Sequence, residues 1–118
     1  MSELRVAKVS ELIKEEMSQM LLYEVKDPRI GFVTVTDVKM TRDLREATVY
    51  VSVMGSEEAV KDTLLGINSA LPFLRREIGK RVRLRFTPTI SFALDKTLDY
   101  SEHIQKLLLK VERGETDD

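Results

Sequence analysis

Apolar and polar side chains alternate over residues 82–94, and this pattern constrains the fold more than any other feature of the chain. The apolar side chains share the even positions: Val82, Leu84, Phe86, Pro88, Ile90, Phe92 and Leu94. The odd positions carry mostly polar side chains: Arg81, Arg83, Arg85, Thr87, Thr89, Ser91, Ala93 and Asp95. A period of two is typical of a strand with one buried face, so we expect Phe86 and Phe92 in the core. Because Pro88 cannot donate to a neighbouring strand, we expect an edge strand or a break there.

Residues 32–40 and 47–53 also carry strand patterns. In the second segment, valines and one alanine alternate with polar residues without interruption. In the first, the phase of the alternation changes after Val35, which indicates a β-bulge near Thr36 or Asp37. The connection between the two segments is so short that it favours an antiparallel hairpin.

Apolar residues at helical spacing predict helices in the remaining segments. Residues 3–23 form one amphipathic stripe, with Ser2 as the expected N-cap, and Ser56 caps a second helix. Asp99 or Ser101 starts a last helix, whose expected inward positions are Ile104, Leu107, Leu108 and Val111.

The second helix cannot continue through Pro72, because proline lacks a backbone donor and clashes with the preceding turn. Proline is well tolerated in the first turn of a helix. We therefore predict a helix–kink–helix at Ala70-Leu71-Pro72, with a third helix over residues 72–78 that Gly79 ends.

This order of elements predicts an α+β fold, a two-layer sandwich in which helices cover one face of a three-stranded sheet. The 118 residues suit one domain. A content of 42% hydrophobic and 33% charged residues suits a soluble globule. No apolar run approaches the roughly 20 residues of a membrane span, and no secretory signal is evident. We expect a soluble, cytoplasmic protein.

The chain offers little for catalysis. It has no cysteine and one histidine, His103, which we expect on a helix surface. Motifs of hydrolases, phosphate-binding loops and zinc proteases are missing from the sequence. Asp95 and Asp99 could share a cation, but acids beside a loop are common by chance. We expect no catalytic residue, no metal site, no cofactor and no small-molecule substrate.

The net charge of −1 conceals a basic segment between residues 75 and 85. Its basic residues are Arg75, Arg76, Lys80, Arg81, Arg83 and Arg85, beside a single acid, Glu77. On the expected strand Arg81, Arg83 and Arg85 share one face about 7 Å apart, a spacing that suits successive phosphates. Arginine binds phosphate bidentately, and counterion release supplies affinity. The alternative is a solvated strand face whose charge nearby acids neutralise, with no ligand. Tyr50 could stack on a base, but an ordinary exposed tyrosine is the alternative for it as well.

Several segments resemble bacterial ribosome-binding factor A. The longest is Val25-Lys26-Asp27-Pro28-Arg29-Ile30-Gly31-Phe32-Val33-Thr34-Val35-Thr36-Asp37-Val38. Shorter ones are Arg5-Val6-Ala7, Ala47-Thr48-Val49-Tyr50-Val51-Ser52-Val53, Leu84-Arg85-Phe86-Thr87-Pro88 and Leu94-Asp95. The resemblance covers about residues 3–110.

The resemblance implies a KH-like fold of the second type and a role on the small (30S) ribosomal subunit. It implies binding to 16S rRNA, help in its late maturation and processing, and a link to growth in the cold. KH domains clamp nucleic acid with a GxxG loop, which this sequence lacks. The resembled family has an Ala-x-Gly kink instead, and here Pro72 replaces the glycine, which adds bulk and removes a donor.

The sequence is thus interpreted as a monomeric, non-enzymatic assembly factor. Residues 1–111 form the KH-like RNA-binding domain and residues 112–118 a disordered acidic tail. The main phosphate contacts are assigned to the six basic residues of the 75–85 segment, with Lys8, Lys26 and Arg29 as weaker candidates. Two alternatives stay open: a protein-interaction module whose basic face binds an acidic partner, and a metal-dependent nuclease.

Overall fold

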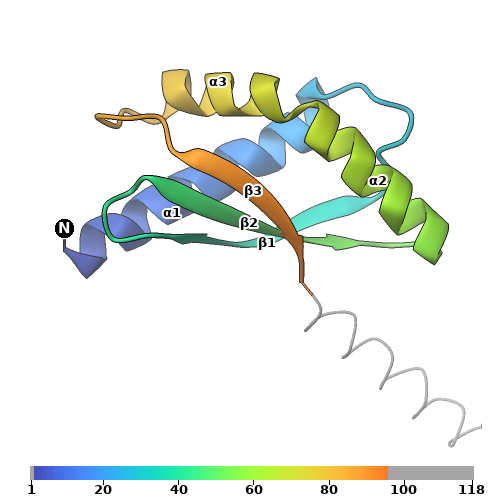
Figure 1. Cartoon of the computed structure of the whole chain (residues 1–118), viewed down its shortest axis with the longest axis horizontal. Coiled ribbons are helices and arrows are strands. Elements are labelled where there is room, and N and C mark those ends of the chain that lie inside the picture. Colours follow the sequence, from blue (N-terminus) through green and yellow to red (C-terminus); the bar gives the residue numbers. More distant parts are fainter. Residues whose placement is uncertain (1, 96–118) are drawn as a thin grey trace, which may run out of the picture.

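The computed structural model describes residues 2–95. Its elements are, in chain order, α1 (Glu3–Gln19), η1 (Met20–Glu24), β1 (Val33–Met40), β2 (Glu46–Val53), α2 (Glu57–Ser69), α3 (Leu71–Arg81) and β3 (Thr89–Leu94). The helices lie against one face of a twisted three-stranded sheet, which confirms the predicted two-layer α+β sandwich (Figure 1). The predicted last helix, with His103 and Asp99, and the predicted tail over residues 112–118 lie outside the described residues.

β2 is the central strand of the sheet, in the order β1-β2-β3. It pairs antiparallel with β1 and parallel with β3. The register of the first pair shifts between Val35 and Asp37, so Thr36 has no partner residue on β2. This bulge turns Val35 and Val38 both inward, at 7% and 5% exposure. The predicted hairpin and the predicted bulge are both confirmed.

In residues 2–95 one hydrophobic core fills the space between the helices and the sheet. Fully buried side chains come from every layer: Ile13, Met17 and Met20, Val49 and Val51, Ile67, Leu74 and Ile78. Burial of one such side chain stabilises the fold by about 1.5–3 kcal/mol. The stripe predicted on the first helix is therefore a core face.

The helix ends follow from local hydrogen bonds. Ser2 Oγ accepts from the Arg5 backbone N–H at 3.2 Å, and Ser56 Oγ accepts from Ala59 N–H at 3.1 Å. α1 passes directly into the wider turn η1, which the Val25 N–H closes by donating to the Met20 carbonyl at 2.9 Å. Together α1 and η1 span the helix predicted over residues 3–23.

The predicted kink lies at Ala70. This residue ends α2 and also precedes α3, with φ −85° and ψ −3°. Its N–H donates to the Gly66 and Ile67 carbonyls, and its own carbonyl accepts from Leu74 N–H at 3.0 Å. Pro72 occupies the first turn of α3, where its missing donor costs no helical hydrogen bond.

The third strand is shorter than the alternation predicts. β3 begins at Thr89, and residues 82–88 form a loop. The parallel register pairs Thr89 with Glu46, the first residue of β2. A strand that began before residue 89 would have only the β1–β2 turn beside it, so the alternating pattern has no partner to pair with. The predicted break at Pro88 coincides with this boundary.

Two further expectations are wrong, one in this loop and one in α3 before it. Phe86 is 50% exposed rather than buried, whereas Phe92 packs against the core as predicted. Gly79 does not end α3, which continues to Arg81. A Cβ at residue 79 would lie 2.7 Å from Thr87 Oγ1, so this glycine lets the helix and the following loop approach closely.

Candidate nucleic-acid interface

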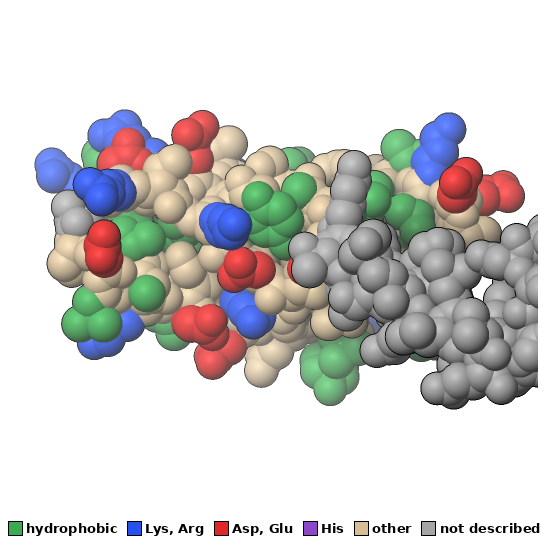
Figure 2. All heavy atoms as spheres, turned by 90° about the horizontal axis from the view of Figure 1, so that it is seen from below, with side chains coloured by type: hydrophobic (Ala, Val, Ile, Leu, Met, Phe, Trp, Pro, Cys, Tyr) green, Lys and Arg blue, Asp and Glu red, His purple; other side chains and the backbone are tan. Residues whose placement is uncertain are grey.

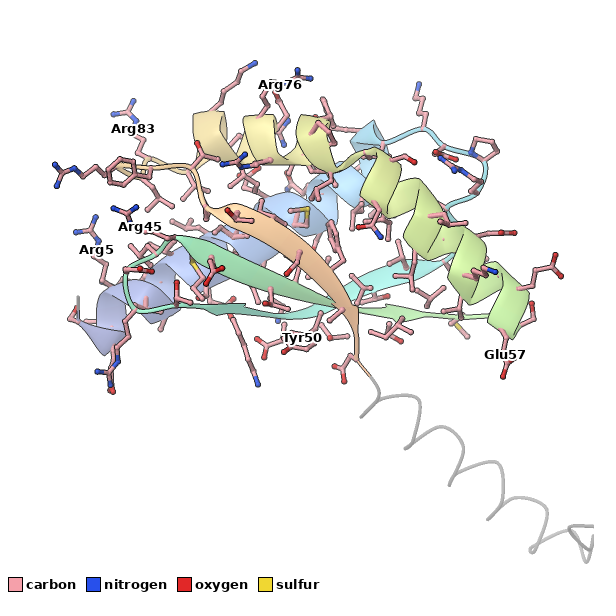
Figure 3. The ribbon with its side chains drawn as sticks, viewed as in Figure 1. Arg5, Arg45, Tyr50, Glu57, Arg76 and Arg83 are labelled. Carbon is pink, nitrogen blue, oxygen red and sulfur yellow. The ribbon has the colours of Figure 1, made fainter. Side chains whose placement is uncertain are left out.

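Two loops meet at one end of the sheet. The Thr89 N–H donates to the Arg45 carbonyl at 2.8 Å, which joins the α3–β3 loop to the β1–β2 turn. We call this region the basic end and define it by five arginines. Arg5, Arg42, Arg45 and Arg85 line one hollow there, and Arg83 lies beside them (Figure 3). Figure 3 shows Arg5, Arg45 and Arg83 there, and Figure 2 shows Lys and Arg side chains gathered at the same end.

The β1–β2 turn has a fixed shape. Leu44 N–H donates to the Thr41 carbonyl at 3.0 Å, and Asp43 Oδ1 accepts from the Thr41 hydroxyl at 2.6 Å and from Arg45 N–H at 3.1 Å. These donors lower the pKa of Asp43. Leu44 has a left-handed backbone, φ 60°, and a side chain only 4% exposed. Burial of Leu44 holds the turn so that Arg42 and Arg45 point outward.

The structure places three of the predicted basic residues on α3. Arg75 Nε donates to the Pro88 carbonyl at 3.2 Å, so Arg75 also holds the α3–β3 loop. Lys80 Nζ lies 3.3 Å from Glu77, with a side chain 71% exposed. The Arg76 side chain is exposed and forms no hydrogen bond or ion pair within residues 2–95. Of these three, Arg76 is the residue most available to a ligand.

Arg81 differs from the prediction. It is the last residue of α3 and not part of a strand. Its guanidinium binds three carboxylates, Glu24 at 2.5 Å, Glu77 at 3.2 Å and Glu16 at 3.3 Å. These contacts, chiefly the one with Glu24, raise the pKa of Arg81, and the Arg81 hydrogen bond lowers the pKa of Glu24. Arg81 therefore ties α3 to α1 and η1.

Arg83 and Arg85 are exposed in the α3–β3 loop, so the expected row of three arginines on one strand face is wrong. The loop instead places both arginines at the basic end, near Phe86. The Arg85 guanidinium lies 5.5 Å and the Arg45 guanidinium 4.7 Å from the centre of the Phe86 ring. Arginine and an exposed ring together are groups that bind unpaired nucleotides.

The weaker candidates are dispersed. Lys8 is exposed on α1, and Lys26 is exposed in the loop before β1. Arg29 donates to both oxygens of Asp27 and to Ser69 Oγ at 3.0 Å, next to the kink. The Arg29 contacts lower the pKa of Asp27 to about 2. None of the three lies at the basic end.

Adjoining hollows connect α3 with the basic end. The first is lined by Pro72, Arg75, Arg76 and Thr87. The next shares Arg75 and Thr87 with it and reaches Arg45 and Phe86, and two acids, Asp43 and Glu46, also line it. The last, about 390 Å³ in volume, is lined by Arg5, Arg42, Asp43, Leu44, Arg45, Leu84, Arg85 and Phe86. A continuous, largely basic surface therefore runs from the kink to the N-terminus of α1.

Sequence reasoning missed Arg5, Arg42 and Arg45. The signal was present in part, because Arg42 and Arg45 lie in the predicted hairpin connection. What could not be predicted was that this turn lies beside the α3–β3 loop, which depends on the parallel pairing of β2 with β3.

Within residues 2–95, no group of three or more His, Cys, Asp or Glu side chains could hold a metal ion. None of the described helices is both long and apolar enough to cross a membrane.

Comparison with known proteins decides the family. The sequence profile of the family described as Ribosome-binding factor A matches residues 5–108. The chain belongs to the ribosome-binding factor A family. A ribosome-binding factor A from Citrifermentans bemidjiense is 48% identical over 114 residues, which are 97% of this chain and 94% of that relative.

Solved structures of ribosome-binding factor A share the fold. The crystal structure of the factor from Thermus thermophilus superposes with a TM-score of 0.66 at 25% identity, over 75% of this chain and 94% of that one. A homology-built Thermus thermophilus factor, fitted into a cryo-EM map of its 30S complex, has a TM-score of 0.56 at 27% identity. That match covers 77% of this chain and 91% of that one. The KH-like fold and the family resemblance are thus confirmed.

Proposed function

We propose that this member of the ribosome-binding factor A family is a non-enzymatic, monomeric assembly factor. In the cytoplasm it binds the 16S rRNA of the immature small ribosomal subunit and assists late maturation and processing, including growth in the cold. The observation that carries the proposal is the continuous basic surface from Arg76 to the basic end. The 30S complex of the Thermus thermophilus relative supports the choice of partner.

The contacts are proposed from exposure. We assign to phosphates the exposed side chains on α3 and the loop after it: Arg76, Lys80, Arg83 and Arg85. Arg75, which holds that loop against α3, is assigned to the same surface. Arg81 is left out, because three carboxylates already surround its guanidinium. Each phosphate neutralised releases condensed counterions, so affinity falls as salt rises. Binding to one arrangement of the RNA then stabilises that arrangement over others.

The test is co-sedimentation with purified small ribosomal subunits across a salt series. We expect a log–log slope of about −3 to −4 for roughly four phosphates. The triple variant Arg76→Gln, Arg83→Gln, Arg85→Gln should bind more weakly, with a slope shallower by about 2–3. The matched control Lys14→Gln, Lys39→Gln, Lys61→Gln removes the same charge from other surfaces and should retain the wild-type slope.

The possible outcomes distinguish RNA binding by this surface from the alternatives. Failure of the wild-type protein to sediment with subunits at low salt would refute ribosome binding. Equal loss in both triple variants would mean that net charge, rather than the surface near α3, determines binding. Salt-insensitive binding to an acidic protein, without RNA affinity, would favour the protein-interaction alternative. For the maturation role, cells that carry only the Arg76, Arg83 and Arg85 variant should accumulate 16S rRNA precursor at low temperature.

A further inference from the structure

We infer that the 390 Å³ hollow around Phe86 is a binding site for one unpaired nucleotide of an RNA strand, with its base stacked at Phe86 and its phosphate among the arginines of the basic end. The inference rests on the proposed function and specifies the RNA feature that the protein recognises, an unpaired nucleotide.

Phe86 distinguishes this hollow from the rest of the basic surface. Phe86 is 50% exposed in the α3–β3 loop, and two guanidinium groups lie over its ring. Single exposed apolar residues are ordinary, so exposure alone decides nothing. The chain offers a comparison: Phe32 is 82% exposed, yet no cation lies over its ring in the described structure. The combination of ring and arginines distinguishes Phe86.

Both kinds of group bind bases. Unpaired bases stack on aromatic rings and on the planar face of arginine guanidinium groups. The same guanidinium groups can donate in pairs to a phosphate. The hollow is lined by four arginines, and two of them, Arg45 and Arg85, lie over the ring. Arg42 also forms an exposed ion pair with Glu3. The base and the phosphate of one nucleotide can therefore find partners together. Its volume lies within the roughly 300–1,000 Å³ usual for small-ligand sites.

The walls of the hollow are held in place before any ligand arrives. Buried Leu44 anchors the turn, Asp43 caps it, and the Thr89–Arg45 hydrogen bond joins it to the α3–β3 loop. A site whose backbone is already ordered loses less conformational entropy on binding. The basic end therefore differs from arginines scattered on a mobile surface.

Asp43 indicates a nucleotide rather than a bare anion. Its carboxylate lines the hollow and makes it less positive than four arginines alone. A carboxylate can accept a hydrogen bond from the amino group of a base, so the hollow offers a partner for the base beside the arginines that suit the phosphate. The hollow also adjoins the one that contains Arg75 and Thr87, so a strand held along α3 can place one of its nucleotides at Phe86.

The experiment compares three hairpin RNAs of equal charge on the stem, by fluorescence anisotropy with the full chain. One stem is fully paired, one carries a single bulged adenosine, and one carries an abasic bulge at the same position. We expect the wild-type protein to bind the adenosine bulge about 5- to 150-fold more tightly than the abasic bulge, the range that base–aromatic stacking gives. This comparison needs no protein variant.

Variants then locate the site. Phe86→Ala should lose the preference for the base while it keeps the affinity for the paired stem. Phe86→Tyr should retain the preference, because it keeps a ring for stacking. Phe32→Ala, at the opposite end of β1, is the matched control and should behave as wild type.

The inference and the proposed function fail separately. Equal wild-type affinity for the adenosine and abasic bulges would overturn the nucleotide site, even if the protein sediments with small subunits. A preference that survives in Phe86→Ala would also overturn it, because the base would bind elsewhere. Absence of binding to subunits and to all three hairpins would instead refute the proposed function.

Discussion

Leu44 combines two properties that usually exclude each other, a buried aliphatic side chain and a left-handed backbone. A left-handed conformation costs an L-residue about 1–2 kcal/mol, and the burial of Leu44 offsets this cost. We predict that Leu44→Gly is more stable than Leu44→Ala, by up to about 1 kcal/mol, because both lose the side chain but only glycine relieves the strain. Urea unfolding of the two variants measures the difference. Greater stability of the alanine variant would mean that the turn moves to another conformation.

Asp27 links the stability of the loop before β1 to pH. Arg29 lowers its pKa from 3.8 to about 2 in the folded protein, mainly through the side-chain hydrogen bond. A lowered folded-state pKa stabilises the protein above the unfolded pKa, and this contribution is lost as the pH falls through the folded one. Asp27→Asn should therefore be less stable than wild type at pH 5–7, and the difference should shrink towards pH 2.

Urea midpoints measured from pH 7 to pH 2 test this prediction. Arg29→Gln removes the donor instead of the acceptor. Its stability should also differ from that of wild type at pH 5–7, and this difference should also shrink towards pH 2. A difference from wild type that stays constant over the range would show that ionisation of Asp27 does not stabilise the fold.

At the scale of elements, α3 and the loop that follows it meet at Gly79. Alanine is favoured over glycine inside a helix by about 1 kcal/mol, but a Cβ here would lie 2.7 Å from Thr87 Oγ1. We predict that Gly79→Ala destabilises the protein alone and stabilises it in the background of Thr87→Ala. The double-mutant cycle should give a coupling of about 1 kcal/mol or more. No coupling would mean that the loop moves away from α3 without cost.

Arg81 joins three elements through its carboxylate partners on α1, η1 and α3. Arg81→Gln leaves those carboxylates close together without a cation, so we expect a lower melting temperature. The salt slope of ribosome binding should stay the same. Arg76→Gln, on the exposed side of α3, should show the opposite pattern: an unchanged melting temperature and a slope shallower by about 1. A shallower slope for Arg81→Gln would return this residue to the RNA contacts.

Most elements could be predicted because their causes are local. The valine phase change at Val35 requires a bulge, Pro72 requires a new helix, and Ser2 and Ser56 cap the helices they precede. The extent of β3 could not be predicted, since a strand needs a neighbour and β2 supplies one only from Glu46 onward. The same β2–β3 pairing determines which residues form the basic end. It places Arg42 and Arg45 beside Phe86, which the sequence pattern alone assigned to the core.

At the scale of the whole molecule, the basic end and the acidic first turn of α2 lie at opposite ends of the described structure (Figure 3). The basic end lies at the β1–β2 turn, and Figure 3 shows Glu57, the first residue of α2, at the opposite end from Arg5. Glu58 follows it in the same first turn. A protein with such a charge distribution is oriented as it approaches a polyanion, with the positive end foremost. We therefore predict the orientation on the ribosome: the basic end faces the RNA.

The absence of cysteine from the sequence makes this orientation measurable. Glu3→Cys and Glu57→Cys each remove one acid and each introduce a single attachment point for an iron chelate that generates hydroxyl radicals. On small ribosomal subunits, the chelate at position 3 should cleave 16S rRNA near the bound protein, because position 3 lies beside Arg42, with Glu3 and Arg42 3.8 Å apart. The chelate at position 57 should cleave at background level. The reverse pattern would place the acidic start of α2 against the RNA, and the basic end would then face solvent or a ribosomal protein.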